Sequence, residues 1–331
     1  QDRLGVFAEH AEDEIAAINM ALGAGYGGAR AMTATSGGGF ALMVEGISMA
    51  GMTETPVVVV LAQRPGPATG LPTRTAQGDL LFAINAGHGE FPKLVLAPYD
   101  AKDAFQKTVR AFNLADKYQI PVILLTDQLL ADAHYSYADF EPATSASYHL
   151  ADPSEMDDYK RYQLTSDGIS PRLYPGQSRH LVCVDSDEHD QKGHITEDLF
   201  ETAPAMVEKR LTKARGLKNE VAPPEEIQTK DAEVVLVGWG SARAAILESI
   251  HLLREEDVKV GMIHFTELWP LPDYRFPENT SLLTVENNAT AQLARLLRSE
   301  FSLSFEKSIR RYDGLPLTGE YIRRQFHAQR R

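Results

Sequence analysis

The chain has 331 residues, 43% of them hydrophobic and 24% charged, and its net charge is −13. This composition is typical of a folded globular protein and not of a disordered chain, and the length suffices for two domains. The acidic balance and the lack of a broad basic stretch argue against nucleic acid as a partner. With one cysteine, Cys183, the chain can form no internal disulfide and cannot hold an iron–sulfur cluster by itself.

The first residues predict a strand followed by a helix. Residues 6–9 are typical of a strand, and Glu12, Asp13 and Glu14 open a segment with apolar residues at helical spacing. The acids therefore belong to the first turn of that helix. Acids are common there because they complement the helix dipole, a stabilisation of about 0.3 to 1 kcal/mol, so position alone does not make Glu14 functional.

Glycines follow this helix. Gly23, Gly25 and Gly28 match a dinucleotide-binding pattern, but they come after a helix and before a strand, which is the reverse of the order that this mechanism needs. After a predicted strand at 31–35, residues 36–39 (Ser-Gly-Gly-Gly) open another helix. Such a turn suits an anion or a ring at a helix N-terminus, although a purely structural turn explains it equally well.

The next part of the chain predicts a parallel sheet. Short apolar runs at 57–61, 94–96 and 122–125 are separated by helix-length segments, as in sheets that are buried on both faces. The helix predicted for 100–117 starts with a capping aspartate, and we expect its apolar stripe to consist of Phe105, Val109, Phe112 and Ala115.

Arg64 stands just after the first of these apolar strands. Loops at the carboxyl ends of parallel strands build active sites, and a guanidinium held there can bind a carboxylate through two hydrogen bonds. We therefore favour a functional role for Arg64 over that of a surface arginine.

The remaining residues predict an extended segment and a second α/β domain. Residues 138–230 are polar and contain few apolar runs, whereas 231–331 contain strands at 233–237, 258–263 and 281–285 and helices at 242–255 and 289–301. Gly238 and Gly240 again resemble a dinucleotide turn, but a structural turn fits better. The loop at 185–194 is interpreted as a solvated polar loop and not a metal site, and Cys183 as a buried structural thiol.

The sequence was compared with the patterns of membrane spans and signal peptides. No apolar stretch approaches the roughly 20 residues of a membrane span, and the first residues do not match a signal peptide. We expect a cytoplasmic protein with no membrane partner.

Several ordered motifs resemble one family. The first domain resembles the pyrimidine-binding domain of 2-oxoacid:ferredoxin oxidoreductase alpha subunits, particularly the 2-oxoglutarate type. The resemblance rests on 11–19 (AEDEIAAIN), 33–43 (TATSGGGFALM), 45–51 (EGISMAG), 63–75 (QRPGPATGLPTRT) and 77–79 (QGD). It continues at 167–172 (DGISPR), 187–190 (DEHD), 193–196 (GHIT) and 268–272 (LWPLP), and it covers nearly the whole chain.

The resemblance implies a fold with three parts. Residues 1–137 correspond to the pyrimidine domain of the thiamine-diphosphate-binding fold, a doubly wound parallel sheet. Residues 138–230 form an inter-domain segment, and 231–331 resemble the C-terminal α/β domain of transketolase. Family chains carry an upstream strand and a Tyr-Pro-Ile-Thr-Pro segment that this sequence lacks, so we expect the first domain to be N-terminally incomplete.

The resemblance also implies a site and a reaction. Glu14 matches the carboxylate that hydrogen-bonds the aminopyrimidine ring of thiamine diphosphate and so activates thiazolium C2 as a nucleophile. Ser36, Gly37 and Gly38 match cofactor-binding positions, and Arg64 and Thr73 match contacts to the substrate carboxylate. A 2-oxoacid then loses CO2, its electrons pass to ferredoxin through an iron–sulfur cluster, and coenzyme A takes the acyl group.

A partner chain is implied as well. The Gly-Asp-Gly signature that binds the diphosphate through magnesium is absent, because Leu80 follows Gly78 and Asp79. The resemblance therefore implies a beta subunit that supplies Mg2+ and a [4Fe-4S] cluster, in an (alpha-beta)2 assembly, with no metal site on this chain.

Alternatives to the 2-oxoglutarate reaction remain open. Arg64 would bind the carboxylate of any 2-oxoacid, so pyruvate, branched-chain 2-oxoacids and indolepyruvate are candidate substrates. A thiamine-dependent decarboxylase or transketolase-like component without ferredoxin chemistry is a second class. A non-catalytic assembly subunit is a third, and it would tolerate the loss of Glu14.

Overall fold

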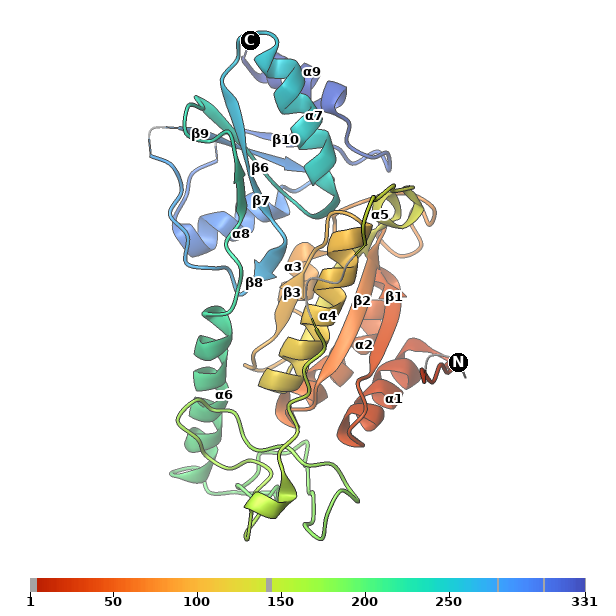
Figure 1. Ribbon diagram of the computed structural model, residues 1–331, viewed down its shortest axis with the longest axis vertical. Coiled ribbons are helices and arrows are strands. Elements are labelled where there is room, and N and C mark those ends of the chain that lie inside the picture. Colours follow the sequence, from red (N-terminus) through yellow and green to blue (C-terminus); the bar gives the residue numbers. More distant parts are fainter. Residues whose placement is uncertain (1–4, 141–144, 279, 306, 331) are drawn as a thin grey trace.

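The first half of the chain folds around a five-stranded sheet with the order β1-β2-β4-β3-β8 (Figure 1). The computed structural model describes residues 5–140, 145–278, 280–305 and 307–330. Four strands are parallel, and the fifth, β8, comes from the C-terminal part and joins the edge antiparallel. The strands are β1 (Met32–Ser36), β2 (Val57–Gln63), β3 (Leu94–Leu96), β4 (Pro121–Asp127) and β8 (Glu267–Trp269). The strands predicted at 31–35, 57–61, 94–96 and 122–125 are thus confirmed.

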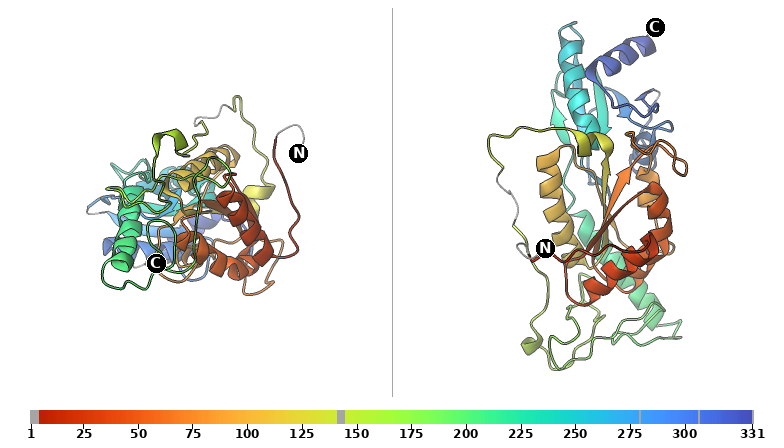
Figure 2. Two further views of the ribbon diagram at one scale, coloured as in Figure 1. Left: turned by 90° about the horizontal axis from the view of Figure 1, so that it is seen from below. Right: turned by 90° about the vertical axis from the view of Figure 1, so that its right-hand side faces the viewer.

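Helices cover both faces of this sheet, as the predicted doubly wound fold requires (Figure 2). Along β2, Val57, Val59 and Leu61 belong to the core under α1 (Glu14–Tyr26) and α2 (Gly37–Met52). Val58 belongs instead to the core under α4 (Ala101–Tyr118). This alternation is the two-residue period of a strand that is buried on both faces. The short helices α3 (Leu80–Ile84) and α5 (Gln128–Asp132) follow near the carboxyl ends of the strands.

Two details of the first domain differ from the prediction. The strand expected at 6–9 is not formed, and Val6 and Phe7 are 58% and 82% exposed. Helix α4 begins as predicted, since Asp100 accepts a hydrogen bond from the backbone N–H of Asp103. Of the predicted stripe, Ala115 is buried and Phe112 packs against the same core, but Phe105 is exposed and packs on Phe140. The buried face also includes Ala111, Leu114 and Tyr118.

The C-terminal part contains a second five-stranded sheet with the order β10-β9-β6-β7-β5. Its strands are β5 (Glu225–Ile227), β6 (Val234–Trp239), β7 (Val260–Phe265), β9 (Ser281–Glu286) and β10 (Ser308–Arg310), and only β5 is antiparallel to its neighbour. The core on one face contains residues of α7 (Arg243–Arg254) and α9 (Gly319–Arg330), and the core on the other face contains residues of α8 (Gln292–Phe301). The strands and helices predicted for this region are confirmed to within a few residues.

The segment between the sheets contains a helix that the sequence did not predict, α6 (Thr202–Lys218). Its buried residues include Lys209, Arg210 and Lys213, so the apolar period that signals a helix is missing. A 3-10 turn, Pro153–Glu155, and long connections make up much of the rest (Figure 1). Strand β5 precedes residue 231 but pairs in the second sheet, and β8 follows residue 231 but pairs in the first. The two parts of the chain thus exchange strands, and the domain boundaries at 137 and 230 stay a prediction.

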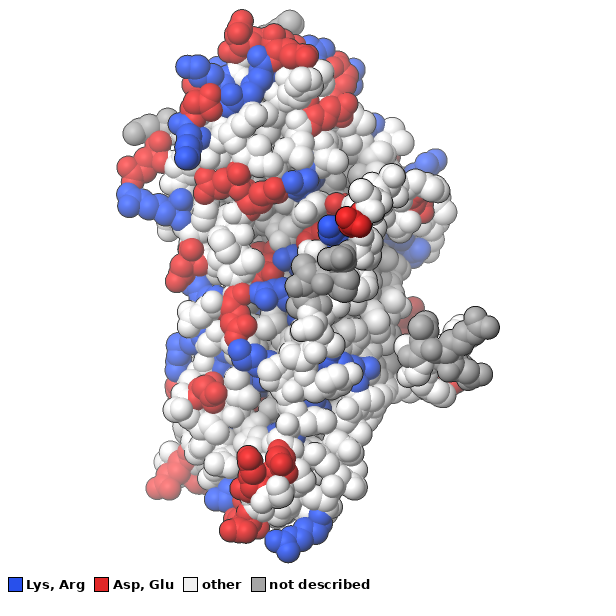
Figure 3. All heavy atoms as spheres, in the orientation of Figure 1, with Lys and Arg blue, Asp and Glu red and all other residues white. Residues whose placement is uncertain are grey.

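The surface carries charges of both signs. On the face seen in Figure 3, acidic and basic side chains alternate in small groups, with no broad basic patch among the residues drawn in colour. No helix in the described part of the chain is long and apolar enough to cross a membrane.

Candidate active site

Glu14 lies at the first position of α1, where Asp13 caps the helix by accepting a hydrogen bond from the N–H of Ala16 at 2.7 Å. The Glu14 side chain reaches the start of α2. A Cβ built on Gly39 would be 2.5 Å from Glu14 Oε1 and 2.1 Å from Thr35 Oγ1. Within the described residues, no hydrogen bond or ion pair engages the Glu14 carboxylate. The glycine therefore makes room for a half-buried carboxylate that is free to bind a ligand.

The turn that Glu14 contacts opens α2. Ser36 is the N-cap residue, but its side chain makes no capping hydrogen bond, and the first turn of the helix contains no acidic residue. Gly37 and Gly38 follow, and a Cβ on Gly38 would meet no atom within 4 Å. The first N–H groups of a helix have no partner within the helix, so this turn presents donors next to open space.

A second carboxylate lies against the same turn. A Cβ on Gly37 would be 3.0 Å from Oδ2 and 3.2 Å from Oδ1 of Asp79. Oδ2 is buried and accepts no hydrogen bond. Burial raises the pKa of Asp79 from 3.8 to about 6. Glu14 and Asp79 thus bring two acids to one glycine-rich helix start.

Arg64 follows β2 directly and is half-buried, and its buried Nε has no hydrogen-bond partner. It lines a cavity of about 400 Å3 together with Asp79. Thr73, the other predicted substrate contact, lies on the exposed part of the same loop and does not line this cavity. The structure therefore brings Arg64 to Asp79 and leaves the role of Thr73 a prediction.

Other residues that line the cavity come from the loops after β9 and β10 and from the start of α8, and they were not predicted. Asn287, Asn288, Thr290 and Gln292 line it, together with Tyr312. The polar sequence 286–288 (Glu-Asn-Asn), at the carboxyl end of β9, is the signal that could have indicated these residues, since such strand ends carry sites in α/β folds.

The turn at 238–242 joins the two sheets. The hydroxyl of Ser241 donates a hydrogen bond to Asp127 Oδ2 at the end of β4, and Gln77 Nε2 donates to Trp239 O at 2.8 Å. The turn thus contacts the first domain, and its interpretation as a purely structural turn stays a prediction.

Two other sequence features, Cys183 and the loop at 185–194, do not belong to the residues that line the cavity of Arg64. Cys183 is half-buried and not fully buried as expected, and its thiol donates to Gly193 O at 3.2 Å. In the loop at 185–194, His189 is buried against Tyr162 with ring centroids 3.8 Å apart. No group of three or more His, Cys, Asp or Glu side chains in the described chain is placed to hold a metal ion.

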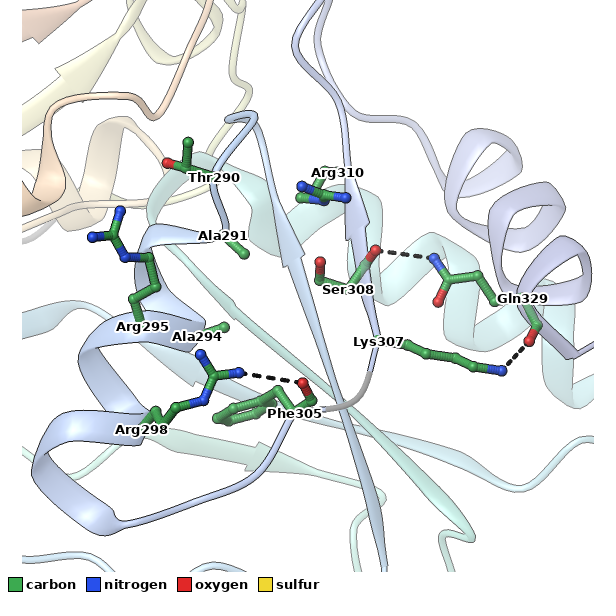
Figure 4. A pocket seen from close by; sticks show the side chains of 10 residues that line it. All are labelled: Thr290, Ala291, Ala294, Arg295, Arg298, Phe305, Lys307, Ser308, Arg310 and Gln329. Atoms are coloured by element: carbon green, nitrogen blue, oxygen red, sulfur yellow. Dashed lines mark hydrogen bonds between the residues drawn. The ribbon is translucent and has the colours of Figure 1, made fainter.

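A second cavity, of about 580 Å3, lies between α8 and β10 (Figure 4). Three of its four basic side chains bind backbone carbonyl groups: Arg298 donates to Phe305 O, Lys307 to Gln329 O and Arg310 to Ala289 O, and the fourth is Arg295. None of the predicted site residues lines it. Of these residues, Arg64 lines the cavity of about 400 Å3, whereas Glu14, Ser36, Gly37 and Gly38 do not line that cavity. The candidate active site therefore comprises the cavity of Arg64 and the start of α2, which Asp79 connects.

Comparison with known proteins identifies related chains. A family model described as "Pyruvate flavodoxin/ferredoxin oxidoreductase, thiamine diP-bdg" matches residues 3–209. The chain is 39% identical over 319 residues to 2-oxoacid:ferredoxin oxidoreductase 1, subunit alpha, of Sulfurisphaera tokodaii, covering 92% of this chain and 49% of that one. It is 35% identical over 271 residues to 2-oxoglutarate synthase subunit KorA of Methanocaldococcus jannaschii, covering 82% and 72%. The chain thus spans about half the length of the longer relatives.

Solved structures agree with these relatives. The 2-oxoglutarate:ferredoxin oxidoreductase of Magnetococcus marinus, solved with 2-oxoglutarate, coenzyme A and succinyl-CoA bound, superposes with a TM-score of 0.88 at 36% identity, covering 100% of this chain and 58% of that one. A split-gene transketolase superposes with a TM-score of 0.50 at 12% identity, covering 95% and 80%, which shows a shared fold.

Proposed function

Because this chain belongs to the family of 2-oxoacid:ferredoxin oxidoreductase alpha subunits, we propose that it contributes Glu14 and Arg64 to a thiamine diphosphate site completed by a beta subunit. The reaction is the oxidative decarboxylation of a 2-oxoacid with coenzyme A, and ferredoxin takes the electrons. Two relatives favour 2-oxoglutarate as the substrate, since one is named a 2-oxoglutarate synthase subunit and the other was solved with 2-oxoglutarate. The products are then succinyl-CoA and CO2.

The observation that carries this proposal is the contact between Glu14 and the start of α2. The Glu14 carboxylate, which has no hydrogen-bond or ion-pair partner among the described residues, lies against Gly39, where any larger residue would displace it. In the neighbouring turn at the N-terminus of α2, a Cβ on Gly38 would meet no atom within 4 Å, so there is space beside this residue. These features fit the aminopyrimidine half of thiamine diphosphate.

When bound, thiamine diphosphate supplies a carbon nucleophile for attack on the 2-oxo group. Glu14 holds a proton at the pyrimidine nitrogen, which a carboxylate does well when water is excluded. Arg64 binds the carboxylate of the 2-oxoacid and so orients its carbonyl carbon. Thr73 is proposed to contribute to the same carboxylate contact.

Other parts of the reaction are assigned to the beta subunit. The described residues show no metal-binding group, and the whole sequence contains one cysteine. Magnesium, which would hold the diphosphate, and a [4Fe-4S] cluster, which would take single electrons, are therefore proposed for the partner. The proposed assembly is (alpha-beta)2.

The test is anaerobic co-purification with the beta subunit, followed by viologen reduction with a panel of 2-oxoacids and coenzyme A. We expect 2-oxoglutarate to give the highest kcat/KM, and Glu14→Gln to abolish most turnover while assembly is retained. Glu12→Gln is the matched control, since Glu12 is exposed and precedes the helix. Near-normal turnover by the Glu14 variant would refute the assignment.

A further inference from the structure

Asp79 occupies an unusual position for a residue at the start of a helix. It is the N-cap of α3, yet its side chain makes no capping hydrogen bond. The carboxylate lies instead against Gly37, two residues before the glycine that Glu14 contacts. It also lines the cavity of Arg64. Asp79 therefore lies between the residue expected to bind the pyrimidine ring and the residue expected to bind the substrate.

The second domain fixes Asp79 in this position. The amide of Gln292 bridges the backbone on both sides of it, donating to Gly78 O at 2.6 Å and accepting from Leu81 N at 2.9 Å. Asn288 Nδ2 donates to Gln77 O at 3.1 Å, and the backbone N–H of Asp79 donates to Gln63 Oε1 at 3.0 Å. These hydrogen bonds order the main chain around Asp79 without engaging its carboxylate.

The main chain at Asp79 is thus held in place, whereas its carboxylate is incompletely satisfied. Its Oδ2 is buried without a hydrogen bond, and no ion pair joins Asp79 to Arg64 within the described chain. Burying a carboxylate without a partner costs free energy, and burial accordingly raises the pKa of Asp79 to about 6. Groups that cost stability in this way tend to be found at functional sites.

We propose that the carboxylate of Asp79 is the counter-charge for the positively charged thiazolium ring of the bound cofactor. This inference rests on the proposed function. The thiazolium ring is joined to the pyrimidine ring and reacts with the 2-oxoacid, so it must lie between the groups bound by Glu14 and by Arg64. Asp79 is the acidic residue that both lines the cavity of Arg64 and contacts the turn next to Glu14.

The charges around Asp79 suit this role. Glu14 contacts the same turn from α1, Arg64 lines the same cavity from the end of β2, and Asp127 ends the neighbouring strand β4. Asn287, Asn288 and Gln292 face it from the second domain with uncharged amides. A cation placed next to the Asp79 carboxylate lowers its pKa. Binding of thiamine diphosphate near pH 6 should therefore release a proton from Asp79.

The test compares two ligands of the assembled complex that differ in the charge of one ring. Thiamine diphosphate is cationic at the thiazolium, whereas thiamine thiazolone diphosphate is neutral there and otherwise keeps the pyrimidine and the diphosphate. Dissociation constants are measured for wild type, Asp79→Asn and the control Asp100→Asn, whose carboxylate only caps α4. We expect Asp79→Asn to weaken thiamine diphosphate at least tenfold and the neutral analogue less than twofold, with no change in the control.

Several outcomes would overturn the inference. Equal weakening of both ligands would make Asp79 a structural support of the turn, and unchanged affinity for both would remove it from the site. If Asp79→Asn fails to assemble, calorimetry of the wild-type complex at pH 6 in two buffers decides, since only thiamine diphosphate should release the extra proton. A wild-type complex that binds neither ligand would refute the proposed function itself.

Discussion

The carboxylate of Glu14 occupies the space that a side chain on residue 39 would need. A Cβ on Gly39 would be 2.5 Å from Glu14 Oε1 and 2.6 Å from Glu14 Cγ, distances that real Cβ atoms do not reach. The position of the Glu14 carboxylate therefore depends on a glycine at residue 39.

Gly39→Ala is expected to displace Glu14 and abolish most thiamine diphosphate binding and turnover. It should also destabilise the chain by about 1 to 3 kcal/mol, because the new methyl group is overpacked. Gly38→Ala is the matched control for stability, since a Cβ there meets nothing within 4 Å and alanine favours a helix by up to about 1 kcal/mol. Urea unfolding of both variants and calorimetric cofactor titration of Gly39→Ala check the prediction. Normal cofactor binding by Gly39→Ala would contradict it.

Arg64→Ala is expected to raise the KM for the 2-oxoacid more than it lowers kcat. The loss in kcat/KM should correspond to about 2 to 4 kcal/mol, because a charged hydrogen-bonding partner of the substrate carboxylate is removed. Arg64→Lys should recover only part of the loss, since lysine cannot form two parallel hydrogen bonds. Arg74→Ala, on the exposed part of the same loop, is the control. Steady-state viologen kinetics measure all three, and an unchanged kcat/KM for Arg64→Ala would exclude Arg64 from the pocket.

The sequence predicted the parts of the fold whose signal is local. The apolar runs of β2 and β4 and the aspartate that caps α4 were recognised because each depends on adjacent residues. Helix α6 was missed because its buried face carries Lys209 and Lys213, which bind Glu54, a residue about 155 positions away along the chain. Hydrophobic periodicity cannot reveal a helix whose contacts are ionic and non-local.

The residues of the candidate site also differ in whether local sequence could predict them. Glu14, Arg64 and the glycine turn were identified because they belong to continuous motifs in the first 79 residues. Asp79 was recognised only as part of such a motif, since its exceptional feature is burial without a partner, which depends on tertiary packing. Gln292 and Asn288 were not predicted to hold residues 77–81, because they reach them across more than 200 positions of the chain. The polar sequence after β9 can indicate that a strand end carries a site, but it does not reveal which distant segment those residues contact.

Asp79→Asn is expected to stabilise the isolated chain at pH 8. Burial raises the pKa of Asp79 from 3.8 to about 6, so between these values the folded chain retains a proton that the unfolded chain has lost. The free energy of unfolding of wild type therefore falls as the pH rises from about 4 to 6 and stays lower above pH 6. The variant lacks this penalty, which is at most about 3 kcal/mol. Urea unfolding at pH 4 and pH 8 checks the sign, and an equal difference at both pH values would contradict it.

Glu54 anchors α6 to the first domain through buried ion pairs. It is 1% exposed, and its carboxylate accepts hydrogen bonds of 2.6 Å from Lys209 Nζ and from Lys213 Nζ. Removing one member of such a cluster leaves buried charges without a counter-ion. Glu54→Gln should therefore lower the free energy of unfolding at pH 7 by about 3 to 5 kcal/mol, as measured by urea unfolding. Glu256→Gln is the control, since Glu256 also contacts two basic side chains, those of Arg323 and His327, but lies at the surface, and we expect no measurable loss.

The pH dependence of the Glu54 variant provides an independent check. Burial alone would raise the pKa of Glu54, but the ammonium groups of Lys213 and Lys209 outweigh it and hold the pKa well below the ordinary value of 4.5. A carboxylate with a lowered pKa contributes stability above the pKa of the unfolded chain and loses that contribution as the pH falls towards the folded value. The difference in the free energy of unfolding between wild type and Glu54→Gln should therefore shrink below about pH 4.5, where wild type loses the contribution of this carboxylate. The comparison is confined to pH 3 to 5, because burial lowers the pKa of Lys213 to about 7, so this lysine titrates between pH 6 and 7 as well. A difference that stays constant down to pH 3 would show that Glu54 stabilises α6 through packing and not through its charge.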